Sequence, residues 1–389
     1  MKRLLTLSLL CVTVFTFKTQ AQEQNRAITT ATPFLLIAAD ARAAGLADQG
    51  VATSPDAFSQ QWNPAKYAFI KNKQGVGVNY TPYLSNLVND IFLGNVNYYN
   101  RINERSAVAA SFRYFSLGDI EFRQGPNDEP NVQKPNELTL DVSYALKLSD
   151  RISMAVAGRY LRSDLRLQGL GADASAAGSF GVDIAGFYRS DEIAFNSFNG
   201  RWRAGATISN IGPKIKYDDA GQENFIPTNF RLGAAFDFIL NEDNRITPSI
   251  EFSKLLVPTP LDPDTNGDGD ITAEEQQAAN DEYNSKSAFG SIFSSWGDAP
   301  DGFSEELKEI TWSLGAEYMY RDVFAFRAGY FNESEEKGAR KFLSLGAGFR
   351  YNIVNLDISY LFSTSSVRSP LEGTLRFGLS FNFGDEYYD

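Results

Sequence analysis

Histidine is absent from this 389-residue chain, and its single cysteine, Cys11, lies close to the start. Histidine is the commonest general base and a frequent metal ligand, so its absence argues against most hydrolytic enzymes. One cysteine cannot form an internal disulfide. After residue 21 there is also no apolar run of about 18 residues, the length that a transmembrane helix requires. The sequence therefore predicts neither an enzyme nor a helical membrane protein.

The first residues have the pattern of an export signal. Lys2 and Arg3 precede an apolar run over residues 4–17, and a small-residue cleavage site ends at Ala21. The apolar run is too short to cross a bilayer as a helix. We therefore expect residues 1–21 to be a cleaved signal peptide, which leaves a secreted mature chain without cysteine.

Alternation of apolar and polar residues is the strongest pattern in the rest of the chain. In the last segment, Leu375, Phe377 and Leu379 alternate with Arg376 and Gly378. Because successive side chains of a strand point to opposite faces, this period of two predicts β-strands. Fourteen such segments are separated by turn residues: 75–82, 91–100, 106–116, 137–148, 151–162, 178–189, 201–211, 226–238, 245–255, 310–320, 323–332, 341–351, 354–362 and 373–383.

The connections between these segments distinguish a membrane barrel from a β-sandwich. With the N-terminus on the periplasmic side, short and long connections alternate, as in outer-membrane barrels, and a sandwich gives no reason for this. The expected periplasmic turns are 101–105, 149–150, 190–200, 241–244, 321–322 and 352–353, of which 190–200 is moderately long. The expected extracellular loops are 83–90, 117–136, 163–177, 212–225, 256–309, 333–340 and 363–372.

The polar face of the segments carries ionisable side chains, which a transmembrane barrel places in its interior while the apolar face meets lipid. They are Arg113, Asp141, Arg159, Asp183, Arg203, Arg231, Asp237, Glu251, Glu317, Arg327, Arg350, Asp357 and Arg376. We therefore expect residues 73–389 to form an all-β, fourteen-stranded antiparallel barrel in the outer membrane of a Gram-negative bacterium. No nucleic-acid partner is expected.

The N-terminal region, residues 22–72, is expected to be a plug-like or periplasmic segment, because residues 29–70 do not alternate. The stretch from Pro33 to Gly45 is small and apolar. Four consecutive residues further on form a Trp-Asn-Pro-Ala motif: Trp62, Asn63, Pro64 and Ala65. This motif either belongs to a plug or serves only to turn the chain into the first strand.

The small-residue stretch, the Trp-Asn-Pro-Ala motif, fourteen strands and an aromatic C-terminal strand together resemble FadL-type outer-membrane barrels. The resemblance is closest to the PorV family of the type IX secretion system and covers essentially the whole mature chain. It implies that the N-terminal stretch occupies the barrel interior. It also implies an adaptor that binds the C-terminal domains of secreted cargo at a translocon subunit and delivers them to a surface attachment complex containing a sortase. Composition and periodicity do not show this role.

The long loop 256–309 contains a pattern typical of a calcium site. Its oxygen-bearing positions follow the twelve-residue calcium loop: Asp264, Asn266, Asp268, the carbonyl of Asp270, and Glu275. Ca²⁺ prefers six to eight oxygen ligands, of which Glu275 would supply two. Residues 257–260 contain two prolines and cannot form an entering helix, so this would be a half motif with a dissociation constant of about 10⁻⁴ to 10⁻³ M. The alternative is a solvated acidic loop without metal.

The same loop carries 13 acidic and two basic residues, a net charge of −11. Such a charge density repels itself unless cations or a basic partner neutralise it. Four apolar side chains in the loop fall on one face of a helix: Phe289, Ile292, Phe293 and Trp296. An apolar face outside the membrane either packs on the barrel rim or binds a partner.

Three classes of function are compatible with these patterns. The first is the secretion adaptor, and the second is a FadL-like channel for hydrophobic solutes with residues 33–45 as its internal gate. The third is an enzyme, such as one that deacylates lipopolysaccharide, and the absence of histidine and of a nucleophile motif argues against it. Identifying the proteins that co-purify from native membranes would separate the adaptor from the other two.

Overall fold

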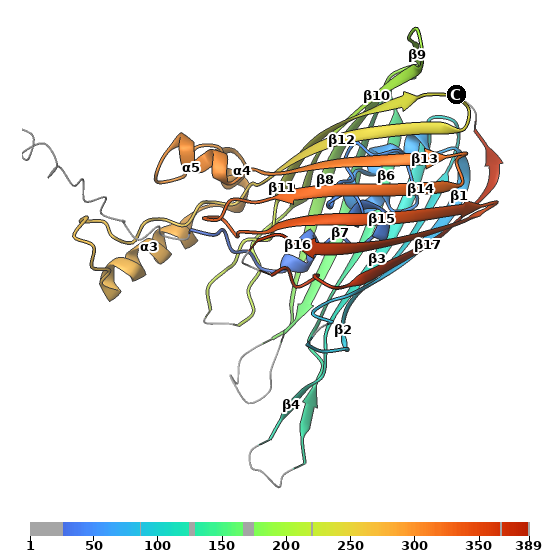
Figure 1. Cartoon of the computed structure of the whole chain (residues 1–389). Coiled ribbons are helices and arrows are strands. Elements are labelled where there is room, and N and C mark those ends of the chain that lie inside the picture. The colour runs from blue at the N-terminus through green and yellow to red at the C-terminus, as the bar shows by residue number, and fades with distance from the viewer. Residues whose placement is uncertain are drawn as a thin grey trace, which may run out of the picture.

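A computed structural model describes residues 26–85, 87–123, 129–165, 175–218, 221–365 and 368–387. The expected signal peptide lies outside the described residues. Fourteen antiparallel strands form a barrel wall, which the pairing of β17 with β1 and of β10 with β11 closes (Figure 1). The strands are β1 (Asn72–Pro82), β2 (Ile91–Arg101), β3 (Ser106–Leu117), β6 (Asn136–Lys147), β7 (Ile152–Asp164), β8 (Ala177–Arg189), β10 (Asn199–Ile211), β11 (Asn229–Ile239), β12 (Asn244–Leu255), β13 (Thr311–Tyr320), β14 (Phe324–Asn332), β15 (Lys341–Tyr351), β16 (Val354–Ser363) and β17 (Leu375–Glu386).

The predicted fold class is confirmed, and the strand ends differ by only a few residues. Two strand starts differ by three residues: β1 begins at Asn72 rather than at residue 75, and β11 begins at Asn229 rather than at residue 226. Pro227 lies in the missing part, and proline cannot donate a hydrogen bond to a strand ladder. We refer to the end of the barrel with the long loops as extracellular, since outer-membrane barrels have short periplasmic turns.

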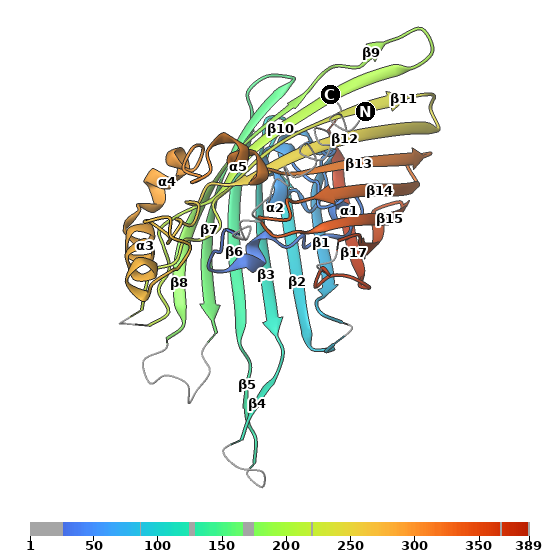
Figure 2. The same ribbon diagram turned by 60° about the vertical axis from the view of Figure 1, so that its left-hand side comes forward.

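Two small hairpins extend the barrel at opposite ends. β4 (Ile120–Phe122) pairs with β5 (Asn131–Gln133) in an extracellular loop, and β9 (Ile193–Ala194) pairs with the start of β10 (Figure 2). The tight periplasmic turn between β13 and β14 uses left-handed backbone at Arg321 (φ 56°) and Asp322 (φ 51°). Positive φ at both central residues matches the twist of a two-residue hairpin turn.

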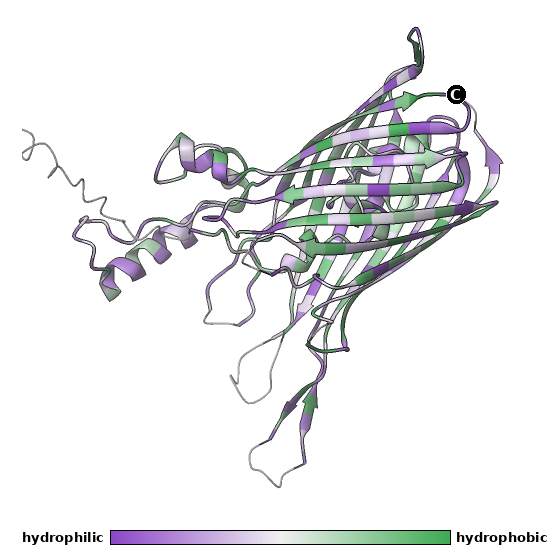
Figure 3. Cartoon of the chain, in the orientation of Figure 1, coloured by the Kyte–Doolittle hydropathy of each residue, from purple (hydrophilic) through white to green (hydrophobic). Residues whose placement is uncertain are grey.

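The two faces of the wall differ in the way that a membrane requires. Leu345 and Phe377 point outward and are about half exposed, whereas their neighbours Ser344 and Arg376 point inward and are buried. The colouring by hydropathy shows this alternation along the strands (Figure 3). A closed wall leaves no unpaired strand edge, so the backbone groups of the strands bond to one another, as hydrocarbon surroundings demand.

The N-terminal residues fill the lumen instead of lying beneath it. They form η1 (Pro33–Leu36), α1 (Ala41–Ala44), α2 (Ser59–Trp62) and η2 (Pro64–Phe69), which are largely buried. The backbone N–H of Ala31 donates to the carbonyl of Phe225 in an extracellular loop. At the other end, Arg101 donates to the carbonyl of Ile70. The segment therefore runs through the barrel from the extracellular to the periplasmic end.

The long loop 256–309 folds into three helices that we call the cap: α3 (Ala273–Ser285), α4 (Ala288–Ser294) and α5 (Phe303–Lys308). The cap lies at the extracellular end, next to the ends of β11 and β12 (Figures 1 and 2). Among the described residues, no helix combines the length and the apolar character that a membrane-spanning helix needs.

Candidate functional site

An ion-pair network joins the N-terminal segment to one side of the barrel wall. Arg42 in α1 donates to both carboxylate oxygens of Glu317 at 3.2 and 3.3 Å, and to Asp56 at 2.6 Å. Arg327 in turn donates to Glu317 at 2.7 Å and to Asp357 at 2.6 Å. These groups are largely or fully buried, so each charge depends on its partners for stabilisation.

The same side of the wall also bonds directly to the backbone of the N-terminal segment. Glu251 accepts from the N–H groups of Gly50 and Val51 at 2.9 and 3.0 Å. Ser344 accepts from the N–H of Ala47 at 2.8 Å. The segment passes so close to β10 that a Cβ atom at Gly205 would lie 2.1 Å from the carbonyl oxygen of Val51. The lumen is therefore filled at this side and held by hydrogen bonds.

The Trp-Asn-Pro-Ala motif lies deep in the lumen and does more than turn the chain. Trp62 donates to Asp40, and the Asn63 amide donates to the carbonyls of Val51 and of Gly186 in β8. The Asn63 carbonyl oxygen accepts from the N–H of Ala65 and so caps η2, which Pro64 begins. The motif thus cross-links three parts of the N-terminal segment and attaches them to the wall.

A cavity of about 530 Å³ opens above the filled lumen at the extracellular mouth. Residues 27–30, residues of loop 333–340 and Glu309 at the end of the cap all contribute to its lining. Apolar rings and charged groups both line it, among them Phe34, Tyr83, Phe331, Arg231, Glu333 and Arg340. This mixture suits an amphipathic segment better than a purely apolar solute.

Four of the predicted calcium residues lie on the exposed loop before α3, and Glu275 lies in the first turn of α3. Asp264 accepts from the N–H groups of Gly267 and Gly269. Glu275 forms a capping box with Thr272 at the start of α3. In the described part of the chain, no three carboxylate, histidine or cysteine side chains are grouped so that they could hold a metal ion. Calcium binding at these residues therefore stays a prediction.

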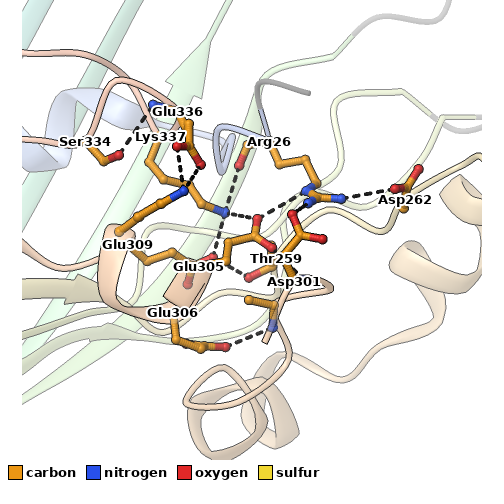
Figure 4. A network of polar contacts seen from close by, with 12 residues as sticks. Arg26, Thr259, Asp262, Asp301, Glu305, Glu306, Glu309, Ser334, Glu336 and Lys337 are labelled. Atoms are coloured by element: carbon orange, nitrogen blue, oxygen red, sulfur yellow. Dashed lines mark hydrogen bonds and ion pairs between the residues drawn. The ribbon is translucent and has the colours of Figure 1, made fainter. Parts of the chain in front are cut away.

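A second ion-pair network, which we call the cap latch, attaches α5 to the barrel rim (Figure 4). Arg26 at the start of the described chain bonds to Asp262, Asp301 and Glu305. Lys337 from the loop between β14 and β15 bonds to Glu305 at 2.6 Å and to Glu309 at 3.0 Å.

Lys254 at the end of β12 completes the cap latch with contacts to Glu306 at 3.0 Å and Glu309 at 2.5 Å. Burial opposes ionisation of Glu305, but the hydrogen bonds from Lys337 and from the N–H of Asp301, together with the charges of Lys337 and Arg26, hold its pKa below the ordinary value. Three cations from distant parts of the chain thus offset part of the negative charge at one end of the acidic cap.

The apolar face predicted for α4 is mostly exposed. Phe289 is 57% and Phe293 81% exposed, and Trp296 is 49% exposed although its ring packs against Phe230 of β11 at 5.5 Å between centroids. Ile292 is partly buried. Phe303 and Leu307 of α5 are also exposed, at 77% and 53%. Packing on the rim therefore covers only part of this face, and large apolar side chains stay open to a partner.

Several of these contacts could not be read from the sequence. The alternation placed Glu317 and Glu251 in the lumen, but nothing in it paired them with Arg42 or with the backbone of residue 50. The cations of the cap latch lie 28 to 279 residues from their partners along the chain. The sequence contained one signal for these cations, the net negative charge of loop 256–309, which requires nearby positive charge.

Comparison with known proteins identifies relatives of this chain. The family model of the type IX secretion system protein PorV matches residues 20–262. No curated protein matches. A solved structure of a TodX variant, a monoaromatic hydrocarbon channel, is similar with 10% identity and a TM-score of 0.51 over 88% of this chain and 98% of that chain. The Ralstonia pickettii toluene transporter TbuX has 12% identity and a TM-score of 0.46 over 90% of this chain and 100% of the other.

Proposed function

The chain belongs to the PorV family of the type IX secretion system, and we propose that it is an outer-membrane adaptor that binds secreted cargo at the cell surface. In this proposal it receives the C-terminal domains of cargo from a translocon subunit. It then delivers them to a surface attachment complex that contains a sortase. The chain is an outer-membrane barrel. What we propose is its cargo-binding role and the residues that perform it.

The observation that carries this proposal is the combination of a filled lumen with an open apolar surface on the cap. The N-terminal segment occupies the barrel interior and bonds to the wall, which disfavours a permanent pore. Above it, Phe289 and Phe293 are exposed at the extracellular end. A soluble surface rarely leaves such side chains together unless they meet a partner.

The charge of the cap favours a partner with a basic surface. The cap carries 13 acidic residues and only two basic ones, and its latch uses three barrel-side cations. Acidic side chains beyond the latch, among them Glu274 and Asp281 of α3, are exposed. A cargo domain with apolar side chains ringed by lysine or arginine would complement this surface, and charge complementarity would also speed its association.

The experiment compares two apolar surfaces of the same protein. The double variant Phe289→Ser, Phe293→Ser removes exposed rings from α4, and the control Leu87→Ser changes a side chain that is 79% exposed in another extracellular loop. Each protein is purified from native membranes, and bound cargo C-terminal domains are quantified. We expect the double variant to lose most bound cargo and the control to keep it, because buried aromatic anchors dominate interface energies. Equal retention in all three proteins would reject this face as the cargo site.

A channel for hydrophobic solutes is the second candidate, and the observation that favours it is the fold similarity to a TodX variant, a monoaromatic hydrocarbon channel. Such a channel must transmit solute past the N-terminal segment, whereas an adaptor need not. Uptake of a radiolabelled aromatic hydrocarbon into cells with and without the protein separates the two. Uptake that depends on the protein, together with normal secretion in its absence, would replace the adaptor by the channel.

A further inference from the structure

The periplasmic end of β10 extends beyond β8, the strand on one side of it. The last pair between the two strands at this end is Arg189 with Arg203, and β10 begins earlier, at Asn199. β11 reaches as far as β10, because its last residue, Ile239, pairs with Asn199. The short strand β9 covers the edge that β8 leaves open and forms with β10 a hairpin that protrudes from the barrel (Figures 1 and 2).

The extracellular ends of β8 and β10 are offset in the converse way. β10 ends at Ile211, which pairs with Val182, whereas β8 begins further out at Ala177. The shear of a barrel accounts for a shift of only about one residue per strand. β10 and β11 have no such offset, since their pairs run to Ser209 with Asn229, the first residue of β11. Together these two strands are therefore displaced toward the periplasm relative to β8.

The protruding end carries five aromatic rings on its outer face, which we call the periplasmic aromatic cluster: Phe195, Phe198, Trp202, Phe236 and Phe238. The ring centroids of Trp202 and Phe236 lie 4.6 Å apart, and those of Phe195 and Phe198 lie 4.7 Å apart. Phe238 joins the two pairs, at 4.7 Å from Phe236 and 5.3 Å from Phe198. Gly200 leaves room for this packing, because a Cβ atom there would lie 2.3 Å from the ring of Phe236.

Stacking leaves much of the periplasmic aromatic cluster uncovered. Trp202 is 51% and Phe195 45% exposed. Phe236 and Phe238 lie on the same side of β11 as Leu232, which is 47% exposed, because every second residue of a strand points to one face. Ile246 of β12 pairs with Phe238 and is 40% exposed. The cluster therefore continues the lipid-facing surface of the wall to its periplasmic edge.

The ionic groups of the hairpin lie on its other face. Arg201 is the register partner of Asp237, which is buried on the inner face and bonded to Arg203. Glu192 pairs with Arg201 at 3.4 Å and accepts from the amide of Asn199 at 2.7 Å. A protein interface commonly surrounds its aromatic anchors with polar contacts. Aromatic rings on an outer face that carries no charge fit the boundary between hydrocarbon and headgroups instead.

We propose that the periplasmic aromatic cluster binds phospholipids of the periplasmic leaflet of the outer membrane. Trp202 and Phe236 contact acyl chains, and Phe195 and Phe198 lie at the level of the headgroups. The cluster thereby anchors this side of the barrel at a greater depth than the neighbouring wall of β8. The proposal does not depend on whether the protein is an adaptor or a channel.

The cap makes the opposite change at the extracellular end of the neighbouring strands. Phe230 and Lys254 pair in register on the outer face, at the next outward positions after Leu232 and Phe252, which are 47% and 41% exposed. Trp296 of the cap packs on Phe230, and cap carboxylates bind Lys254, which is only 3% exposed. The cap thus takes the place of lipid at one end, and the periplasmic aromatic cluster adds lipid contact at the other. This arrangement keeps the cap close to the membrane surface.

The test places a nitroxide beside the cluster in the assembled barrel, since the predicted mature chain has no cysteine. Leu240→Cys leaves all five rings in place, and Leu240 is 44% exposed. Phe377→Cys on the outer face of β17 is the reference for lipid, and Asp150→Cys in a periplasmic turn is the reference for water. Each protein is reconstituted into vesicles of phosphatidylethanolamine and phosphatidylglycerol. Power-saturation EPR then measures how often the nitroxide collides with oxygen and with a nickel chelate.

At Leu240→Cys we expect a ratio of oxygen to nickel collisions about tenfold above that at Asp150→Cys, because a polar chelate is excluded from hydrocarbon. Adding Phe195→Ser and Phe198→Ser should lower this ratio several-fold toward the water reference, since the rings no longer hold this edge in lipid. The matched control is Ile102→Ser, which changes a side chain that is 54% exposed at another periplasmic turn. It should leave the ratio at Leu240→Cys unchanged.

Three results would overturn the proposal. A ratio at Leu240→Cys equal to that at Asp150→Cys would place the cluster in water, where it could meet only a periplasmic protein. Protection of the nitroxide from both reagents would show that protein, and not lipid, covers this face. An unchanged ratio after removal of Phe195 and Phe198 would show that the rings do not hold this edge in lipid. Heat-modifiable migration in gels checks assembly, and Trp202→Ser replaces the double variant if that variant does not assemble.

Discussion

The lumen network around Arg42 and the cap latch both pair cations with carboxylates, but in different surroundings. In the lumen, Arg42, Glu317, Arg327 and Asp357 alternate in charge and are largely buried. In the cap latch, five carboxylates surround three cations, and Asp262 and Asp301 are 39% and 70% exposed at their side chains. The lumen network is largely buried throughout, whereas the cap latch is buried at Lys254, Lys337 and Glu309 but open to solvent at Asp262 and Asp301.

This difference in burial determines which ion pairs can be replaced by contacts with a partner protein or with solvent. Breaking an ion pair in a buried network leaves an uncompensated charge and is strongly destabilising. Charges at an exposed edge keep much of their hydration, so their partners are replaced at low cost. We therefore expect the lumen network to define where residues 42–63 lie, and the cap latch to be the part that responds to partners, salt and acid.

The largest effect should come from Arg42→Ala. It removes the shared partner of Glu317 and Asp56, and breaking such a buried pair costs about 3–5 kcal/mol. Urea unfolding should show this loss, and the variant should conduct in planar bilayers while the parent conducts poorly. The control is Arg340→Ala, whose pair with Glu333 is half exposed and contributes about 1 kcal/mol or less. Similar losses in the two variants, or a large steady conductance of the parent, would contradict the comparison.

A slightly smaller effect is expected at the lipid face of the same wall. Leu345→Arg places a cation against lipid, which costs about 2–4 kcal/mol near the membrane midplane and should impair assembly. Ser344→Arg points inward, and alternation alone suggests that it is milder. Because Ser344 packs against Ala47, we expect an assembled barrel whose N-terminal segment is displaced. Heat-modifiable migration reports assembly and bilayer conductance reports displacement, and two unassembled variants would refute this assignment.

The cap should loosen in acid before the barrel does. The pKa of Glu305 is held below its ordinary value of 4.5, so the stabilisation from its ionised form is complete above that value and is lost as the pH falls through the lowered pKa. Pepsin cleavage of loop 256–309, followed over this range, measures the change. In Glu305→Gln, pepsin should cut the loop faster than in the parent even at the upper end of the range. The cleavage rate of this variant should also change less with pH. An unchanged pH profile in this variant would assign the transition to other carboxylates.

The smallest effect concerns calcium. With a dissociation constant near 1 mM, a millimolar concentration of Ca²⁺ stabilises the ordered loop by only about 0.4 kcal/mol. Calorimetric titration of the parent and of Glu275→Gln measures binding, and proteolysis of the loop with and without Ca²⁺ measures ordering. We expect weak binding and slower cleavage in the parent alone. No heat and equal cleavage in the parent would show that the loop does not bind calcium.

The secondary structure and the barrel could be predicted because both depend on sequence patterns within single strands and turns. A period of two along β17, with Phe377 outward and Arg376 inward, is set by the geometry of a single strand and needs no knowledge of its neighbours. The short connections then predicted that strands which follow one another in the chain are antiparallel neighbours in the barrel. The Trp-Asn-Pro-Ala motif was found for the same reason, although its contacts were not.

The contacts that decide how the lumen and the cap behave join residues far apart in the chain, and only the tertiary structure brings them together. Arg42 and Glu317 are 275 residues apart, and Arg26 and Glu305 are 279 apart. Alternation states that a side chain points inward but not which group it meets there. It could therefore place Asn95 and Glu251 in the same lumen without showing that the folded N-terminal segment bonds to Glu251, whereas the side chain of Asn95 has no hydrogen-bond partner among the described residues.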